Sequence, residues 1–141
     1  MRSFATFVPA KTIFPAAIAA MTLLSVGLAT RNYMAPKQNL SGAVDYLRTD
    51  LDAEARVYGV GVAGPLYNSF YGADWSLIET EDDLNTALQT PGPVYLVIAF
   101  PGRYFRVLPT MDVMADAGSL ELVKRFPGTL GDGNVLIFKR G

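Results

Sequence analysis

The run VYLVIAF, residues 94–100, has no charged side chain among its seven positions. An unbroken apolar run of this length is typical of a strand that is buried on both faces, in a sheet covered by helices on both sides. Strand-like and helical patterns alternate on either side of the run. They predict an α/β fold: a small three-layer α/β/α, Rossmann-like domain with a mainly parallel sheet.

Two further strands and three helices are expected before this run. ARVYGVGVA (55–63) and WSLIE (75–79) have the β-rich or alternating patterns of strands. Apolar residues at helical spacing predict a helix that starts near Ser41, a plausible N-cap, and helical turns are expected over 65–71. Thr80 is expected to cap the third helix, whose first turn carries acids that the helix dipole favours.

The segment after the run predicts a helix in two pieces and then a hairpin. Pro109 divides the helical stretch, because proline cannot continue a helix without losing a hydrogen bond. LELVKRF (120–126) and VLIFKR (135–140) have strand patterns, and the Gly-rich sequence PGTLGDGN between them suits a hairpin loop. The sheet is therefore expected to have an antiparallel C-terminal edge.

Residues 13–30, IFPAAIAAMTLLSVGLAT, contain no charge over 18 positions. A helix of that length is about 27 Å long, close to the roughly 30 Å thickness of the hydrocarbon core of a bilayer. Pro15 falls in the expected first turn, where its missing N–H costs little. The sequence predicts a transmembrane helix over 12–31 after an N-terminal stub of residues 1–11.

A linker over 32–40 and an α/β domain over 41–141 are expected to follow this helix. The competing prediction is a cleaved signal peptide with Gly27-Leu28-Ala29 at the cleavage site, but the apolar run exceeds the usual core of such peptides. The short, acid-free N-terminal flank favours a cytoplasmic N-terminus. We therefore expect a single-pass protein of the inner (cytoplasmic) membrane with its C-terminal domain on the periplasmic, extracytoplasmic side.

The composition excludes several kinds of chemistry. The sequence contains no cysteine and no histidine, which removes thiol nucleophiles, serine–histidine triads and the usual zinc ligands. The formal net charge of −1 gives no basic field for a nucleic-acid partner. We expect a protein that is not an enzyme and that has no cofactor and no metal site.

Gly59-Val60-Gly61-Val62-Ala63-Gly64 has the G-x-G-x-x-G spacing of a dinucleotide-binding loop. Glu79 lies where such folds place the acid that binds a ribose. Three features oppose nucleotide binding: the first two glycines fall inside the expected strand, Pro65 follows at once, and the next helix is about half the usual length. We expect the glycines to pack the strand closely against a helix.

Four acids surround the start of one expected helix: Glu79, Glu81, Asp82 and Asp83. A cation site or an acid/base pair is conceivable there, but acids at a helix start most often cap the helix and face solvent. The sequence Asp132-Gly133-Asn134 lacks the further oxygen ligands of a calcium loop. We expect it to form a turn.

Aromatic and arginine side chains follow the first and third expected strands, whose ends meet at one edge of a parallel sheet. Tyr, Trp and Arg dominate protein interfaces, so a partner-binding surface is predicted, with closure of the core as the alternative for half of these residues. Its members are Tyr67, Phe70, Tyr71, Trp75, Arg103, Tyr104, Phe105 and Arg106. In the apolar helix, the predicted contacts with another membrane helix are small residues: Ala16, Ala20 and Gly27.

Five parts of the chain carry a family resemblance: the apolar helix, NYMAPKQNLSGAVDYL, VYGVGVAGPLY, GPVYLVIAFP and VKRFPGTLGDGNVLIFKR. Over residues 12–140 they resemble the C-terminal end of family 39-like membrane glycosyltransferases, multi-span enzymes that move sugars from polyprenyl-phosphate carriers. The resemblance implies a last membrane helix followed by a small exported α/β domain. The family's catalytic aspartate lies in its multi-span half, so no catalytic residue carries over to these positions.

The function that follows is a non-catalytic, single-pass subunit that packs against and stabilises a larger membrane protein complex, such as a photosynthetic or respiratory assembly. Its partners would be that complex and the lipid bilayer. The alternative is an accessory binding module of a membrane glycosyltransferase system, which recognises a lipid-linked sugar or an acceptor.

Overall fold

The computed structural model of the chain describes residues 10–34, 38–51, 54–129 and 131–141. The chain divides into two compact units, residues 1–35 and residues 36–141. Most of the predicted stub and the middle of the predicted linker lie outside the described residues.

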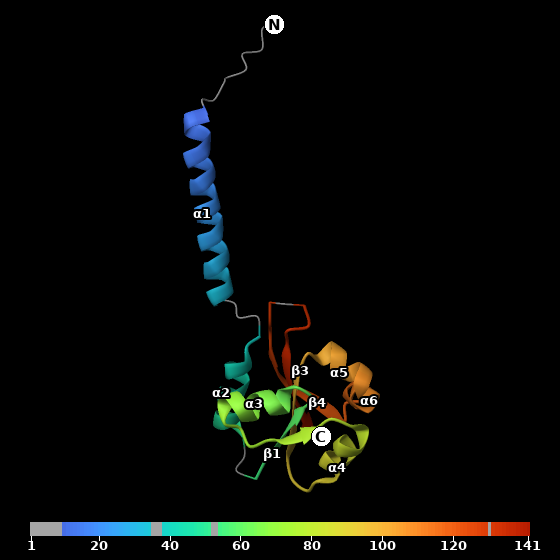
Figure 1. Cartoon of the computed structure of the whole chain (residues 1–141). Helices are drawn as coiled ribbons and strands as arrows, with labels where there is room; N and C mark the ends of the chain where they lie inside the picture. The colour runs from blue at the N-terminus through green and yellow to red at the C-terminus, as the bar shows by residue number, and fades with distance from the viewer. Residues whose placement is uncertain (1–9, 35–37, 52–53, 130) are drawn as a thin grey trace. The chain divides into compact units, whose positions relative to one another are not determined.

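Helix α1, Ala10–Met34, makes up the described part of the first unit (Figure 1). Its residues Ile13–Met34 are long and apolar enough to cross a membrane, with a mean hydropathy of 1.9. The helix extends beyond both ends of the predicted span. Pro15 therefore lies inside α1 and not in its first turn, because the helix already begins at Ala10. Its ring removes one hydrogen bond from the helical ladder.

The second unit contains one five-stranded sheet with the strand order β2-β1-β3-β5-β4. Strand β3 pairs in parallel with β1, and β1 pairs in parallel with β2, whereas β5 is antiparallel to both of its neighbours. The predicted α/β class and antiparallel C-terminal hairpin are confirmed, but the sheet is mixed and not mainly parallel. The reason is that β5 inserts between β3 and β4. The strands are β1 Arg56–Val60, β2 Ser76–Ile78, β3 Val94–Ala99, β4 Leu120–Phe126 and β5 Val135–Arg140.

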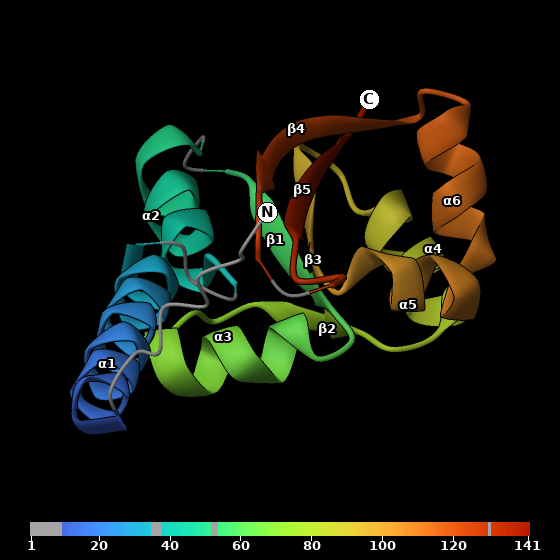
Figure 2. The same ribbon diagram turned by 90° about the horizontal axis from the view of Figure 1, so that it is seen from above.

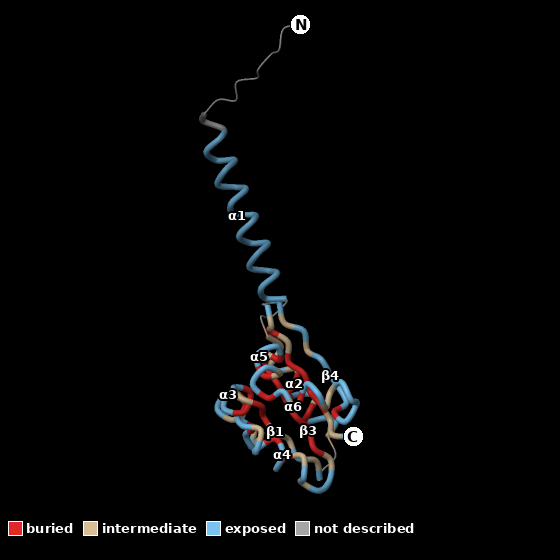
Figure 3. Tube along the Cα trace, turned by 90° about the vertical axis from the view of Figure 1, so that its right-hand side faces the viewer, coloured by how far each residue is buried: buried red, intermediate tan, exposed pale blue. Residues whose placement is uncertain are grey.

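Helices cover both faces of this sheet, as Figure 2 shows. Helices α2 and α3 pack on the face that receives Val97, whereas α4, α5 and α6 pack on the face that receives Leu96 and Ile98. All six residues of β3 are buried, which agrees with an apolar strand that helices cover on both faces. Figure 3 shows that the buried residues gather in the sheet layer. The helices are α2 Leu40–Asp50, α3 Ala63–Tyr71, α4 Glu81–Gln89, α5 Pro101–Val107 and α6 Pro109–Asp116.

The predicted cap of α4 is confirmed, and the predicted cap of α2 is wrong. Thr80 and Asp83 form a capping box, and the hydrogen bond from the Thr80 hydroxyl, then those from two backbone amides, lower the pKa of Asp83. Helix α2 begins at Leu40, so Ser41 is already inside it. The N-cap is Asn39, whose Oδ1 accepts a hydrogen bond from the Gly42 N–H at 3.1 Å.

Arg140, the last residue of β5, ties the end of α4 to the sheet. Its guanidinium donates hydrogen bonds to the carbonyls of Leu88, Thr90 (2.7 Å) and Gly92 (2.6 Å). The last carbonyls of a helix have no partner within it, and a cation at that end also interacts favourably with the helix dipole.

Replacing Arg140 by alanine should lower the free energy of unfolding by about 2 kcal/mol, since hydrogen bonds to a charged donor are lost. Urea unfolding of the full chain in mild detergent, followed by the fluorescence of Trp75, measures the change, because the sequence contains one tryptophan. The control is Arg125→Ala, which removes an exposed arginine that donates a weak 3.3 Å hydrogen bond to Asn134 and should change stability by under about 0.5 kcal/mol. Equal losses in the two variants would contradict this role of Arg140.

Candidate functional site

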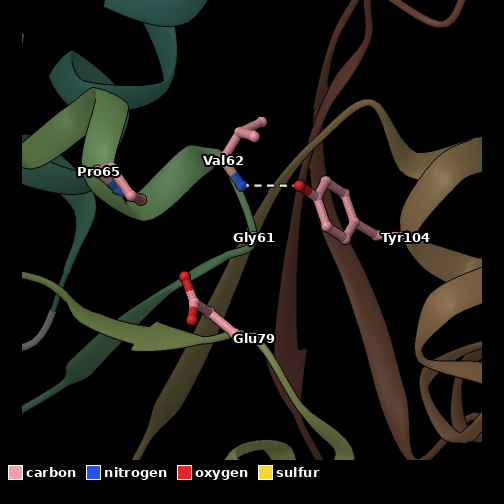
Figure 4. Close-up of a pocket in the computed structure, with 5 residues that line it drawn as sticks. All are labelled: Gly61, Val62, Pro65, Glu79 and Tyr104. Atoms are coloured by element: carbon pink, nitrogen blue, oxygen red, sulfur yellow. Dashed lines mark hydrogen bonds between the residues drawn. The ribbon is translucent and has the colours of Figure 1, made fainter.

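The carboxyl ends of β1 and β3 lie side by side, with Val60 opposite Ile98. From this edge β1 continues into α3 on one face of the sheet, whereas β3 continues into α5 on the other face (Figure 2). Chains that diverge in this way leave a crevice at the strand ends, where open α/β sheets bind their ligands. A pocket of about 250 Å³ lies at this edge and is lined by Gly61, Val62, Pro65, Glu79 and Tyr104 (Figure 4).

The Tyr104 hydroxyl closes one side of this pocket. It accepts a hydrogen bond of 2.9 Å from the backbone N–H of Val62, the N-cap residue of α3 (Figure 4). The tyrosine is only 8% exposed and belongs to the core on the α5 face of the sheet. The N-cap amide of α3 is therefore already bonded to a neutral hydroxyl, at the place where a nucleotide-binding loop presents amides to a phosphate.

The three glycines of the G-x-G-x-x-G sequence allow close packing. A Cβ atom at Gly59 would collide with the backbone of Gly64, and one at Gly61 would collide with the Tyr104 ring. The predicted packing role is confirmed, with one correction. Gly61 lies in the turn after β1 and has a φ of +56°, because β1 ends at Val60 and α3 begins only three residues later.

Glu79 supplies the one carboxylate of the pocket lining. It directly follows β2, and its exposed side chain points towards Pro65 in Figure 4. The neighbouring acids have other contacts: Asp83 caps α4, and Glu81 accepts a hydrogen bond of 3.1 Å from the Thr110 N–H. Among the described residues, no group of three acids is placed to hold a metal ion.

The predicted partner-binding residues do not form one surface, because α3 and α5 lie on opposite faces of the sheet. Tyr67 is fully buried and packs against Trp75, with ring centroids 4.6 Å apart. Burial raises the pKa of Tyr67, and its hydroxyl has no hydrogen-bond partner among the residues that the structure describes. Tyr67 therefore belongs to the core, and its burial removes its side chain from any surface that a partner could contact. Tyr104 also packs in the core but still lines the pocket.

The other predicted residues differ in exposure. Phe70 is 81% exposed on α3, and Tyr71 and Trp75 are half-buried beside it. Arg103 and Arg106 are exposed on α5, whereas Phe105 is half-buried and packs edge-on against Phe138. The exposed part of the predicted surface thus reduces to Phe70 on one face and to the two arginines on the other.

Sequence reasoning missed two contacts at this edge. The first is the bond between Tyr104 and the amide of Val62, for which the only local signal is the turn glycine at Gly61. The second involves the loop between β4 and β5, expected to be only a turn. Asp132 of this loop accepts a hydrogen bond of 3.3 Å from the backbone N–H of Arg103, and so binds the start of α5.

Comparisons with protein-family models, with curated proteins and with solved structures found no match to this chain. The resemblance to membrane glycosyltransferases therefore stays a prediction.

Substitution of Gly61 by alanine should destabilise the domain far more than the same substitution at Gly72. Both glycines have positive φ values, +56° and +61°, but a Cβ atom meets the Tyr104 ring at Gly61 and nothing within 4 Å at Gly72. We expect Gly72→Ala to cost about 1 kcal/mol from backbone strain and Gly61→Ala at least about 2 kcal/mol more.

Urea unfolding of the full chain in detergent, followed by Trp75 fluorescence, measures both variants. Similar losses at the two positions would show that Tyr104 does not fill the space beside Gly61.

Proposed function

We propose that the chain is a non-catalytic, single-pass membrane-anchored subunit that packs against and stabilises a larger membrane protein complex. In this proposal its α/β domain stands on the periplasmic face of the inner membrane. The observation that carries the proposal is the exposure of α1: its candidate span, Ile13–Met34, has no buried residue.

The side chains of α1 need an apolar environment that the chain itself does not supply. Phe14, Met21 and Leu23 are each more than 70% exposed. Burying one large apolar side chain stabilises a protein by about 1.5–3 kcal/mol relative to leaving it in water. A helix of this composition therefore favours lipid or another protein as its surroundings. If α1 spans the bilayer beside a partner helix, one of its faces contacts that helix and the other faces contact lipid.

The predicted contact residues lie on one face of α1. At 100° per residue, Ala16, Ala20 and Gly27 fall within about 40° of one another around the helix axis. A Cβ atom at Gly27 would meet nothing within 4 Å, so the backbone is accessible there. Small residues on one face allow a second helix to approach closely.

The pocket supports a binding role and not a chemical step. It brings together one carboxylate, Glu79, and one tyrosine hydroxyl, Tyr104, which is already engaged with Val62. An acid and a hydroxyl can orient a ligand by hydrogen bonds. We also infer a Rossmann-like first half of the domain, since β1, β2 and β3 are parallel and have the spatial order β2-β1-β3.

A second candidate function is favoured by this pocket: an accessory binding module that recognises a lipid-linked sugar or an acceptor. The two candidates differ in what remains attached to the chain after gentle solubilisation. A co-purifying protein supports the subunit, and a co-purifying glycolipid supports the binding module.

The subunit proposal is tested by changing one face of α1 at a time. Ala20→Leu adds bulk to the predicted contact face, whereas Ala29→Leu adds the same bulk about 180° away around the helix. We expect Ala20→Leu to reduce the co-purifying protein about fivefold or more and Ala29→Leu to leave it unchanged, because a close helix contact worth 1–2 kcal/mol is lost only in the first variant.

Quantitative mass spectrometry of the mild-detergent extract from native membranes provides the measurement. A chain that runs as a lone monomer, or that loses its partner equally in both variants, contradicts the proposal.

A further inference from the structure

We propose that the pocket at the carboxyl edge binds the hydroxyl groups of an uncharged sugar ring. This inference rests on the second candidate function and names the group that such a module would recognise. It is supported by the polar groups that line the pocket, by the Val62 amide that is already bonded, and by the size and apolar lining of the pocket.

The pocket offers one hydrogen-bond acceptor and one donor. The Glu79 carboxylate accepts hydrogen bonds only, and its side chain lines the pocket beside Pro65. The oxygen of Tyr104 accepts the amide proton of Val62, which leaves its own proton available to a ligand. Two neighbouring hydroxyls of a sugar ring can donate to the carboxylate while one of them accepts from the tyrosine. An acid that follows the second strand binds a ribose diol in the same way in dinucleotide-binding folds.

The pocket is poorly suited to a phosphate. One of the amides at the start of α3, that of the N-cap residue Val62, is already bonded to the Tyr104 hydroxyl, and Pro65 has no N–H to offer. The nearby Glu79 carboxylate repels negative charge. Arg103 and Arg106 are not among the lining residues of the pocket. These features distinguish the site from a nucleotide site although the glycine spacing is shared.

The size and the apolar part of the lining also fit a single ring. The volume of about 250 Å³ lies below the 300–1,000 Å³ of pockets for drug-sized ligands. Val62 is 40% exposed and Pro65 is exposed, and both present carbon surface next to the polar pair. The C–H face of a sugar ring can rest on such a surface while its hydroxyls reach Glu79 and Tyr104.

A sugar ring presents the same hydroxyl groups whether it is free in solution or attached to a lipid. Only residues 35–39 separate α1 from α2 in the sequence. A ring carried by a lipid head group and a ring of a soluble sugar are therefore both possible sources, and they share the same recognition chemistry.

Titration of the ¹⁵N-labelled full chain in phosphatidylcholine nanodiscs tests the inference. Methyl α-D-glucopyranoside should shift the amide resonances of Val62 and Glu79 in a saturable manner. Glucose 1-phosphate, which adds a phosphate to the same ring, should bind at least about fivefold more weakly. Tighter binding of glucose 1-phosphate, or no saturable shift with either compound, would overturn the proposal.

Two matched variants show whether the carboxylate is responsible. Glu79→Gln should weaken binding of the glucoside about tenfold, since hydrogen bonds to a charged acceptor are stronger than those to a neutral amide. Glu121→Gln, an exposed glutamate on β4, should leave the affinity unchanged. Equal affinity of the Glu79→Gln variant and the unmodified chain would refute the assignment. Urea unfolding of both variants checks that they remain folded.

The source of the ring is resolved with nanodiscs that contain about 10 mol% glucosyl diacylglycerol in phosphatidylcholine. A shift at Val62 without added sugar supports a lipid head group as the ligand. A shift only with the soluble glucoside supports a soluble sugar. The subunit proposal is unaffected by either result, because it depends on the Ala20→Leu and Ala29→Leu comparison.

Discussion

The burial of β3 on both faces is the constraint on which the rest of the domain depends. All six of its residues are buried, so helices must cover the sheet on both sides. Both faces are covered because α3 follows β1 on one face of the sheet and α5 follows β3 on the other face. The crevice at the carboxyl ends of β1 and β3 is a direct consequence. The pocket thus exists because of the way the core is covered.

Tyr104 links the two sides of this crevice. Its ring is part of the core on one face, and its hydroxyl bonds the amide of Val62, 42 residues earlier in the chain, at the start of a helix on the other face. Gly61 makes room for that ring, which explains a glycine at the turn. One side chain therefore supports packing, satisfies a backbone amide and shapes the pocket.

The parts of the fold that could be predicted are those encoded by neighbouring residues. The capping box of Thr80 and Asp83 spans four residues, and Pro109 divides α5 from α6 as its missing N–H requires. It is harder to predict from the sequence that Asn39, and not Ser41, is the N-cap of α2. Both residue types cap helices, so residue type alone does not decide between them, and the structure identifies Asn39 by its hydrogen bond to the Gly42 N–H.

The candidate site could be predicted only in part. Parallel strands place Glu79 and the turn after β1 at one edge, but nothing local shows that Tyr104 reaches the amide of Val62. For α3 the helical spacing gave no usable signal: Ala63, Tyr67 and Phe70 recur at the spacing of one helix face, yet the first two are buried and Phe70 is exposed. The inserted position of β5 depends on pairing between distant segments, which no short pattern specifies.

The role of α1 as a retained membrane anchor is the claim that most needs a direct measurement. The sequence has no cysteine, so one cysteine introduced at the exposed Asn85 reports on the location of the domain. Labelling of this variant in intact spheroplasts with a membrane-impermeant maleimide, followed by mass spectrometry of the labelled chain, tests the claim. We predict labelling without lysis and a mass that includes α1. Labelling only after lysis, or a chain that begins near Thr30, would contradict it.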